Sequence, residues 1–286
     1  MLKIAVPNKG RLSEATIELF RKAGLHLADT RERKLFATAL DGRVQVLFLR
    51  AQDIPEFVQD GVAHLGITGA DIIAETGKKV DERLDLGFGL CKLIVAVPDK
   101  SEAKTAADIP DGSRVASSFP RLTRDYFAGL GKQVAVVEVS GATELTPSIG
   151  VADAIVDLTS SGSTLAMNKL RQVGTIMTST ARVIAVPNLP PDLETLTASI
   201  LSALESVRAA RGKRYLMANV PRDRLDAVRA ILPGITGPTI MDILSHGDML
   251  AVHAVVPERG LFELIEDLKE LGATGLLVLP IERLVP

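Results

Sequence analysis

The chain has 286 residues, 47% of them hydrophobic and 24% charged, and its formal net charge is -2. This composition predicts a folded globular protein with one large domain or two to three smaller ones. A net charge this close to zero gives no electrostatic reason to expect nucleic acid or an anionic membrane as a partner. No apolar segment approaches the roughly 20 residues that cross a bilayer, and the opening MLKIAVPNKGRL lacks the long apolar stretch of a secretory signal. We therefore expect a cytoplasmic protein.

Cysteine and histidine usage argues against two kinds of site. The single cysteine, Cys91, cannot form an internal disulfide or a cysteine metal cluster. Its apolar surroundings, GLCKLIVAV, predict a buried structural thiol. The four histidines lack metal-ligand spacings such as H-x-x-x-H, so the sequence predicts no dedicated metal site.

Short β-branched runs alternate with helical patterns in the first part of the chain. From Leu12 to Ala23 apolar residues recur at helical spacing, and Gly24 follows in the position where a left-handed cap is usual. The other predicted elements are strands at 2–6, 44–49 and 64–68 and a short helix at 54–60. Alternation of this kind predicts an α/β fold with a largely parallel sheet.

Polar residues follow two of these strands. Lys9 and Arg11 come directly after the first strand, at the edge where α/β sheets bind ligands, and cations there suit phosphate groups. The alternative for both is a solvated helix start. The segment ITGAD, with Gly69 and Asp71, is a second strand-to-glycine turn that offers backbone donors and a carboxylate. It equally fits an ordinary turn in which Asp71 caps the next helix.

Two nearly identical strands, LIVAVP at 93–98 and RVIAVP at 182–187, flank a self-contained α/β stretch. We interpret them as paired crossings between two lobes, lobe I from residues 1–92 with 182–210 and lobe II from residues 93–181. A hinged pair of lobes encloses a cleft, where ligands commonly bind. The alternative is that they are two ordinary strands of one sheet.

An acid and several small hydroxyl residues follow an apolar strand in lobe II. The segment DLTSSGSTL starts at Asp157 and leads into a predicted helix at 165–170, which the hydroxyl of Ser163 or Thr164 can cap. A glycine-containing turn before a helix presents free N–H groups to an anion. The turn adds hydroxyl donors, and its glycine lets the backbone approach a ligand closely. These residues are Thr159, Ser160, Ser161, Gly162, Ser163 and Thr164.

The position of Asp157 beside an anion site needs a separate explanation, because a carboxylate repels the oxygens of a phosphate. A phosphorylated sugar resolves the conflict. Asp157 then accepts hydrogen bonds from ribose hydroxyls while the turn holds the 5′-phosphate. The alternative is a capped helix after a serine-rich turn, with Asp157 solvated.

A basic segment, AARGKR at 209–214, precedes a different pattern. The predicted order there is strand, helix, strand, strand, helix, strand, at 215–220, 221–232, 238–244, 249–256, 261–271 and 275–280. Pro221 fits the first turn of its helix, where the missing N–H costs nothing. This is the order of the ferredoxin-like fold, so we expect residues 211–286 to form a separate module.

The longer stretch ELTPSIGVADAIVDLTSSGSTL, residues 144–165, resembles the signature of the ATP phosphoribosyltransferase family. The signature is met at Glu144, Gly150, Ala152, Ile155, Asp157, Ser161, Gly162, Thr164 and Leu165. The segments PNKGRLSE, FLRAQDIPEFVQDG, LGITGADIIAE and FPRLTRDYF also resemble this family, so the similarity covers almost the whole chain. The ending LKELGATGLLVLPIERL is similar to the extra module of its long, self-regulated branch.

The resemblance implies a fold and a reaction. The fold has two lobes like those of type II periplasmic binding proteins, followed by a C-terminal ferredoxin-like regulatory module. The reaction transfers phosphoribosyl from 5-phosphoribosyl 1-pyrophosphate to N1 of ATP, releases pyrophosphate and begins histidine biosynthesis. The family uses no covalent intermediate, and Mg²⁺ arrives largely on the substrate phosphates rather than in a protein cage.

The resemblance also implies which residues bind the two substrates. Glu144 and Asp157 would hold the ribose hydroxyls, and residues 159–164 would hold the 5′-phosphate. ATP binding would fall to Lys9, Arg11, Gly69 and Asp71.

In the long branch of the family the last module binds histidine, the end product, within a homo-oligomer. The resemblance places the histidine contacts at Ile235, Thr239 and Ala254. The family's acidic residue in the first strand of this module is missing here, where residues 216–219 read LMAN. We nonetheless expect histidine inhibition and a homo-oligomer between dimer and hexamer. The competing interpretations are a non-catalytic small-molecule sensor on the same fold and a silent regulatory partner of another transferase.

Overall fold

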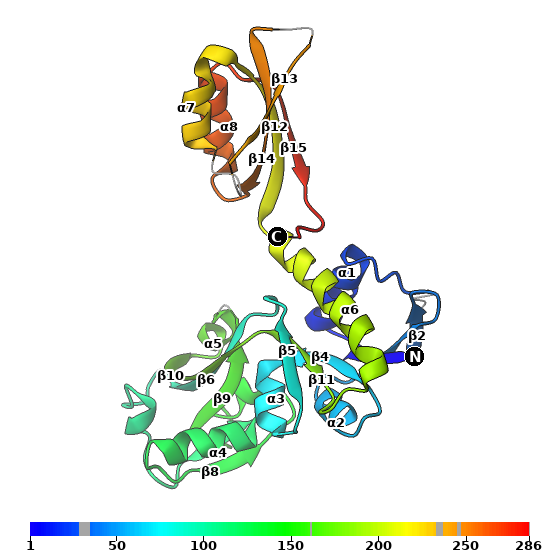
Figure 1. The fold of residues 1–286 in the computed structure, drawn as a ribbon. Helices are drawn as coiled ribbons and strands as arrows, with labels where there is room; N and C mark the ends of the chain where they lie inside the picture. Colours follow the sequence, from blue (N-terminus) through cyan, green and yellow to red (C-terminus); the bar gives the residue numbers. More distant parts are fainter. Residues whose placement is uncertain (29–34, 161, 233–236, 245–246, 286) are drawn as a thin grey trace. The chain divides into compact units, whose positions relative to one another are not determined.

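The computed structural model describes residues 1–28, 35–160, 162–232, 237–244 and 247–285. The chain divides into two compact units, Met1–Leu201 and Ser202–Pro286 (Figure 1). Two sheets lie in the first unit and a third lies in the second unit. Among the described residues, no helix combines the length and apolar character that crossing a membrane requires.

The first sheet has six strands in the order β2-β3-β1-β4-β11-β5. β1 (Leu2–Pro7) lies parallel to β3 (Val44–Leu49) and to β4 (Leu65–Gly69), but the other three pairings of this sheet are antiparallel, so the prediction of a largely parallel sheet holds only for its centre. These strands are continuous apolar runs because central parallel strands are covered on both faces. The antiparallel strands of this sheet are β2 (Phe36–Ala39), β11 (Ala181–Ala185) and β5 (Asp81–Asp85).

Helices connect the strands of the first sheet, as the 3.6-residue periodicity predicts. They are α1 (Arg11–Lys22), α2 (Ile54–Gln59) and α3 (Ala70–Thr76). α1 buries Leu19 and Phe20, and Gly24 follows it with φ +84°, so the predicted left-handed stop is confirmed.

The second sheet has five strands in the order β10-β6-β9-β7-β8. Its strands are β6 (Cys91–Pro98), β7 (Arg114–Ser117), β8 (Ala135–Glu138), β9 (Ala154–Thr159) and β10 (Leu170–Ser179). One face packs Leu93 and Val95 with Phe127 of α4 (Pro120–Gly129). The opposite face packs Ile94 with Leu165 of α5 (Ser163–Met167). Alternate residues of β6 therefore serve two separate apolar cores.

The strands at 93–98 and 182–187 do not pair with each other, and the alternative that they are two strands of one sheet is wrong. They lie in β6 and β11, which belong to different sheets, and β6 pairs with β10 instead. The chain leaves the first sheet between β5 and β6 and returns between β10 and β11. The sequence did not predict β10 because the strand lacks a clear period-2 pattern. Register shifts interrupt its pairing near Gly174, and several of its side chains are exposed.

The C-terminal sheet has the order β13-β14-β12-β15 and confirms the predicted ferredoxin-like sequence of elements. Its strands are β12 (Lys213–Pro221), β13 (Thr239–Asp242), β14 (Met249–Pro257) and β15 (Thr274–Pro280). α7 (Leu225–Ile231) and α8 (Leu261–Glu270) pack against this sheet, where Val228 and Leu268 join one core (Figure 1). The long helix α6 (Pro191–Ala210) precedes this sheet.

Pro221 does not begin a helix, contrary to prediction. It is the last residue of β12, paired with Met249, and a short 3₁₀ turn, η3 (Arg222–Arg224), separates it from α7. A proline is tolerated there because a strand end does not require its missing N–H.

Candidate active site

The acid-and-hydroxyl segment begins within the carboxyl half of β9 and continues into the turn that follows. β9 continues to Thr159, so Asp157 lies within the strand, opposite Ile94 of β6, rather than at its end. Thr159 Oγ1 accepts a hydrogen bond of 3.0 Å from the N–H of Gly162, which closes the turn. Gly162 has φ +76° and is the N-cap of α5, a conformation that favours glycine.

Two expectations about this turn are wrong. Neither Ser163 nor Thr164 caps α5 through its hydroxyl, because Gly162 occupies the cap position and the helix has no side-chain cap among the described residues. α5 ends at Met167, and residues from Leu170 onward form β10 instead of continuing the helix. Both hydroxyl residues are exposed at the first turn of α5, as is Ser160 just before it. Ser161 lies outside the described residues.

Asp157 and Glu144 are two neighbouring acids. Glu144 belongs to the 3₁₀ turn η2 (Thr143–Leu145), which packs against β9, and both side chains are half-buried. Burial raises the pKa of Asp157, and the charge of Glu144 raises it further. Hydrogen bonds from the N–H of Leu158, at 2.7 Å, and from the hydroxyl of Thr143 lower this pKa and offset part of the increase. Within the described part of the chain neither acid has a cationic partner, so both are available to donors from a ligand.

The cations Lys9 and Arg11 follow the carboxyl end of β1, on the same side of the first sheet as the turn after β4. β1 and β4 are parallel and pair Ala5 with Gly66, so Asn8 comes level with Gly69 at their carboxyl ends. Gly10 is the N-cap of α1 with φ +79°, and both cations are exposed. Neither forms an ion pair with any residue that the structure describes. Two exposed cations and a glycine turn beside the carboxyl ends of parallel strands are groups of the kind that bind anions in α/β proteins.

Asp71 does not cap α3, which removes the simpler of its two interpretations. α3 has Gly69 as its N-cap, and the Asp71 side chain is only 4% exposed. Its Oδ1 accepts a hydrogen bond from the hydroxyl of Ser179, and its own N–H donates to Ser179 Oγ at 3.1 Å. Asp71 belongs to the first sheet's helix α3, whereas Ser179 is the last residue of β10 in the second sheet.

Strand register places Ser179, the partner of Asp71, and Thr159 at the same end of the second sheet. Ser179, which holds Asp71, pairs with Cys91 at the start of β6. The next residue of β6, Lys92, pairs with Thr159 at the end of β9. Because adjacent strands lie about 4.8 Å apart, the backbones of Ser179 and Thr159 are separated by roughly 10 Å, at adjacent register positions whose side chains point to opposite faces.

Sequence reasoning missed two residues that join the sheets. Ser179 is one, and its only sequence signal is a small hydroxyl at the end of the run TIMTSTA. Glu75 of α3 is the other: its carboxylate accepts hydrogen bonds from the N–H groups of Arg121 and Leu122, at 2.8 and 2.9 Å. A carboxylate from one lobe thereby caps the N-terminus of α4 in the other, a contact between distant segments that no local pattern reveals.

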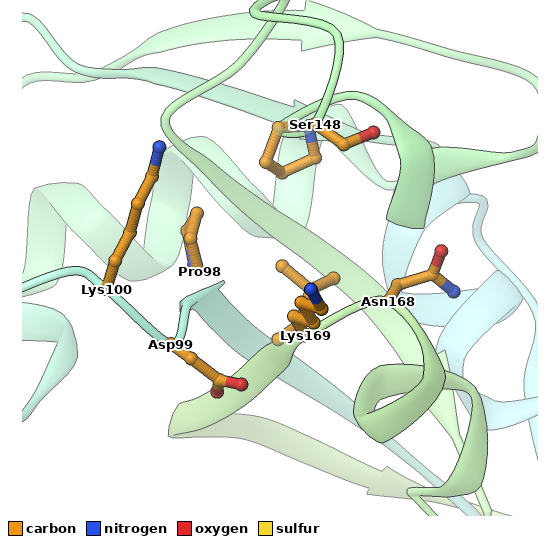
Figure 2. Close-up of a pocket in the computed structure, with 8 residues that line it drawn as sticks. Pro98, Asp99, Lys100, Ser148, Asn168 and Lys169 are labelled. Atoms are coloured by element: carbon orange, nitrogen blue, oxygen red, sulfur yellow. The ribbon is translucent and has the colours of Figure 1, made fainter.

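A separate cavity of about 310 Å³ lies against the second sheet, where β6 ends and β10 begins (Figure 2). Lys100, Ser148 and Lys169 are among the residues that line it. β6 enters beside Thr159 at Lys92 and reaches this cavity at Pro98. The cavity therefore lies at the end of β6 opposite to the end that adjoins Thr159.

The residues expected to bind histidine lie in different environments. Thr239 is exposed at the start of β13, and Ala254 is 4% exposed within β14. Ile235 lies outside the described residues. On β14, His253 pairs with Thr239 across the sheet, and its Nδ1 lies 2.8 Å from the hydroxyl of Tyr215.

Sequence profiles of two families match the chain. The profile described as ATP phosphoribosyltransferase matches residues 50–206, and the profile described as HisG, C-terminal domain, matches residues 210–283. The ATP phosphoribosyltransferase of Methanocella arvoryzae is 49% identical over 286 residues, which is 100% of both chains. That of Natronomonas pharaonis is 50% identical over 285 residues, again with 100% of both chains covered.

A solved structure agrees with these matches. The ATP phosphoribosyl transferase (HisG:HisZ) complex from Thermotoga maritima superposes with a TM-score of 0.64 at 28% identity, covering 73% of this chain and 98% of that chain. The two sheets of the first unit form two lobes, and a C-terminal module follows. With a profile match over more than half of its length and full-length relatives at about half identity, the chain belongs to the ATP phosphoribosyltransferase family, in its long form with a C-terminal domain.

Proposed function

We propose that this transferase binds 5-phosphoribosyl 1-pyrophosphate at the turn after β9 and ATP at the turns after β1 and β4. Membership of the family gives the reaction: a pentosyl group passes to N1 of ATP and pyrophosphate leaves, in the first step of histidine biosynthesis. The placement rests on one observation: Ser179, which binds Asp71, and Thr159 lie two strands apart at the same end of the second sheet. This spacing leaves room for both substrates, whose reacting atoms must meet at about 3–3.5 Å.

On the donor side, each part of the sugar phosphate has a matching group. The exposed hydroxyls of Ser160, Ser163 and Thr164 and the backbone around Gly162 receive the 5′-phosphate. Asp157 and Glu144 accept hydrogen bonds from the ribose hydroxyls. Their combined negative charge also stabilises the positive charge that develops on the sugar as pyrophosphate departs.

On the acceptor side, Lys9 and Arg11 receive phosphate oxygens, either of the ATP triphosphate or of the departing diphosphate. The backbone at Gly69 and the carboxylate of Asp71 receive the adenosine portion. This assignment is supported by the position of the two turns, which follow the carboxyl ends of the neighbouring parallel strands β1 and β4.

Enzymes of this family use a divalent metal ion, and we propose Mg²⁺. The part of the chain that the structure describes contains no group of three or more His, Cys, Asp or Glu residues able to hold a metal. Glu144 and Asp157 supply two carboxylates, a donor set that fits an ion whose remaining ligands are phosphate oxygens and water. When bound, such an ion would neutralise part of the negative charge of the diphosphate.

The domain organisation that we propose assigns residues 1–92 with 182–210 to lobe I, 93–181 to lobe II and 211–286 to regulation. Histidine then binds the regulatory region near Thr239 and Ala254 and lowers activity within a cytoplasmic homo-oligomer of two to six chains. The match to the HisG C-terminal domain supports this assignment. Titration calorimetry with millimolar histidine tests it, and an absence of heat, together with unchanged activity, contradicts it.

The activity itself is tested by pyrophosphate release from the purified full chain with both substrates present. We expect release only when ATP, 5-phosphoribosyl 1-pyrophosphate and Mg²⁺ are all supplied, with N1-phosphoribosyl-ATP identified by mass spectrometry. Binding of one nucleotide without any turnover would instead favour the sensor interpretation.

A further inference from the structure

Asp71 and Ser179 form a buried pair that joins two distant segments of the chain. Asp71 is 4% exposed and Ser179 is 1% exposed. Two hydrogen bonds run in opposite directions between them: the Asp71 N–H donates to Ser179 Oγ at 3.1 Å, and the Ser179 hydroxyl donates to Asp71 Oδ1. One small hydroxyl therefore fixes both the backbone and the carboxylate of the first turn of α3.

The surrounding backbone leaves the carboxylate of Asp71 little freedom. The N–H of Ala70 donates to the carbonyl of Thr180 at 3.0 Å, which attaches the same turn to the residue after Ser179. A Cβ atom at Gly69 would lie 2.2 Å from Asp71 Oδ1, so the carboxylate folds back over a glycine that has no side chain. The Asp71 side chain therefore has one orientation, which depends on Ser179.

The two oxygens of Asp71 differ in their partners. Oδ1 is held by Ser179, whereas Oδ2 has no hydrogen bond and no cation within the part of the chain that the structure describes. Cys91 is the strand partner of Ser179, and burial together with the charge of Asp71 raises its thiol pKa, so it remains a neutral neighbour. A carboxylate with one oxygen fixed and the other unengaged accepts a hydrogen bond from a ligand at a defined angle.

We infer that Ser179 is a positioning residue for the nucleotide: it orients Asp71 so that Oδ2 accepts from a hydroxyl or amino group of the adenosine portion. This inference rests on the proposed placement of ATP at the turn after β4. Ser179 itself touches no substrate, because it is 1% exposed and its hydroxyl both donates to and accepts from Asp71. Loss of that hydroxyl leaves the carboxylate free to rotate, and the acceptor is no longer preorganised for the nucleotide.

The test is Ser179→Ala in the full chain, with both substrates varied in steady-state assays and ATP binding measured by calorimetry. We expect the KM and Kd for ATP to rise about tenfold, the size of a lost hydrogen bond to a charged group. The KM for 5-phosphoribosyl 1-pyrophosphate should change less than twofold. Ser206→Ala is the matched control, since Ser206 is equally buried at 2% but lies in α6, and it should leave both KM values unchanged.

A double-mutant cycle separates positioning from a general loss of structure. In an Asp71→Ala background, Ser179→Ala should add less than twofold to the KM for ATP, because Ser179 acts through Asp71. If it adds its full tenfold, or if both KM values rise equally in the single variant, the inference is wrong. Where the alanine variant does not fold, Ser179→Cys preserves the volume and weakens the donor, and an unchanged Kd for ATP then overturns the inference.

These outcomes are distinguishable from a failure of the proposed function. A wild-type chain that releases no pyrophosphate contradicts the proposed function itself. A wild-type chain that is active, beside a Ser179→Ala variant with an unchanged KM for ATP, contradicts only the role of Ser179.

Discussion

The turns after β4 and after β9 share a plan and differ in environment. Each passes from a strand through a glycine into a short helix, and each has an acid nearby, Asp71 in the first turn of α3 and Asp157 near the end of β9. Asp71 is buried and bound by Ser179, so its orientation is set before any ligand arrives. Asp157 is half-buried beside Glu144, without a cation among the described residues, and the hydroxyls that follow it are exposed.

The difference shows two ways to prepare a carboxylate for a ligand. A carboxylate that a protein donor already holds gives a fixed contact and contributes to the fold. A carboxylate buried near a second acid is destabilised in the free protein, and ligand hydroxyls that donate to it relieve that cost. Substitutions at the β4 turn should therefore affect stability and binding together, whereas substitutions at the β9 turn should separate activity from stability.

The largest expected effect is that of Asp157→Ala on turnover. Loss of the ribose acceptor should lower kcat/KM by about 100- to 1,000-fold, since the contact strengthens as positive charge develops on the sugar. Pyrophosphate release measures the loss, and circular dichroism checks that the fold is kept. Asp153→Ala is the control: Asp153 is paired with Arg114 near the start of β9, and its removal should change turnover less than twofold. Equal losses in both variants would show that the effect is structural.

Gly69→Ala should be next in size and should affect both stability and binding. The added Cβ meets Asp71 Oδ1 at 2.2 Å, and the backbone there is ordinary, with φ -78°, so the effect is steric. We expect the free energy of unfolding to fall by about 1–3 kcal/mol and the KM for ATP to rise about tenfold. Gly129→Ala in α4 has open space around its Cβ and should be neutral or slightly stabilising, by up to about 1 kcal/mol. Denaturant unfolding of the two variants gives the comparison.

Asp157→Asn should raise stability while abolishing most activity. The folded protein holds the Asp157 proton to a higher pH than the unfolded chain, because burial and Glu144 raise the pKa. The wild type therefore loses stability as pH rises from about 4 through the raised pKa, and asparagine escapes this loss. We expect a Tm higher by about 1–3 °C at pH 7.5 and a difference that vanishes below pH 4. A Tm gain that is independent of pH would contradict the role of the charge.

Ser160→Ala should give the smallest effect. Ser160 is exposed in the β9 turn and is one of several donors for the 5′-phosphate, so its loss removes a single hydrogen bond. We expect the KM for 5-phosphoribosyl 1-pyrophosphate to rise about two- to tenfold with no measurable change in stability. Calorimetric titration with that substrate provides the measurement. A rise in the KM for ATP instead would place the wrong substrate at this turn.

The sequence alone determined the elements that have strong local signals. The helix that ends before Gly24, the apolar strands of the first sheet and the order of elements in the C-terminal module follow from periodicity and glycine placement. The acid-and-hydroxyl segment from Asp157 to Thr164 was also visible, because its composition is unusual after an apolar strand.

Only the tertiary structure decided which strands pair and which polar groups are already engaged. The similarity of residues 93–98 and 182–187 suggested a pair, yet β6 pairs with β10, whose own pattern is weak. Asp71 was expected as a helix cap or a ligand contact, and Ser179, 108 positions along the chain, holds it. Local patterns report which face of an element is apolar, whereas hydrogen bonds between distant segments depend on how the sheets come together, and no local pattern encodes that.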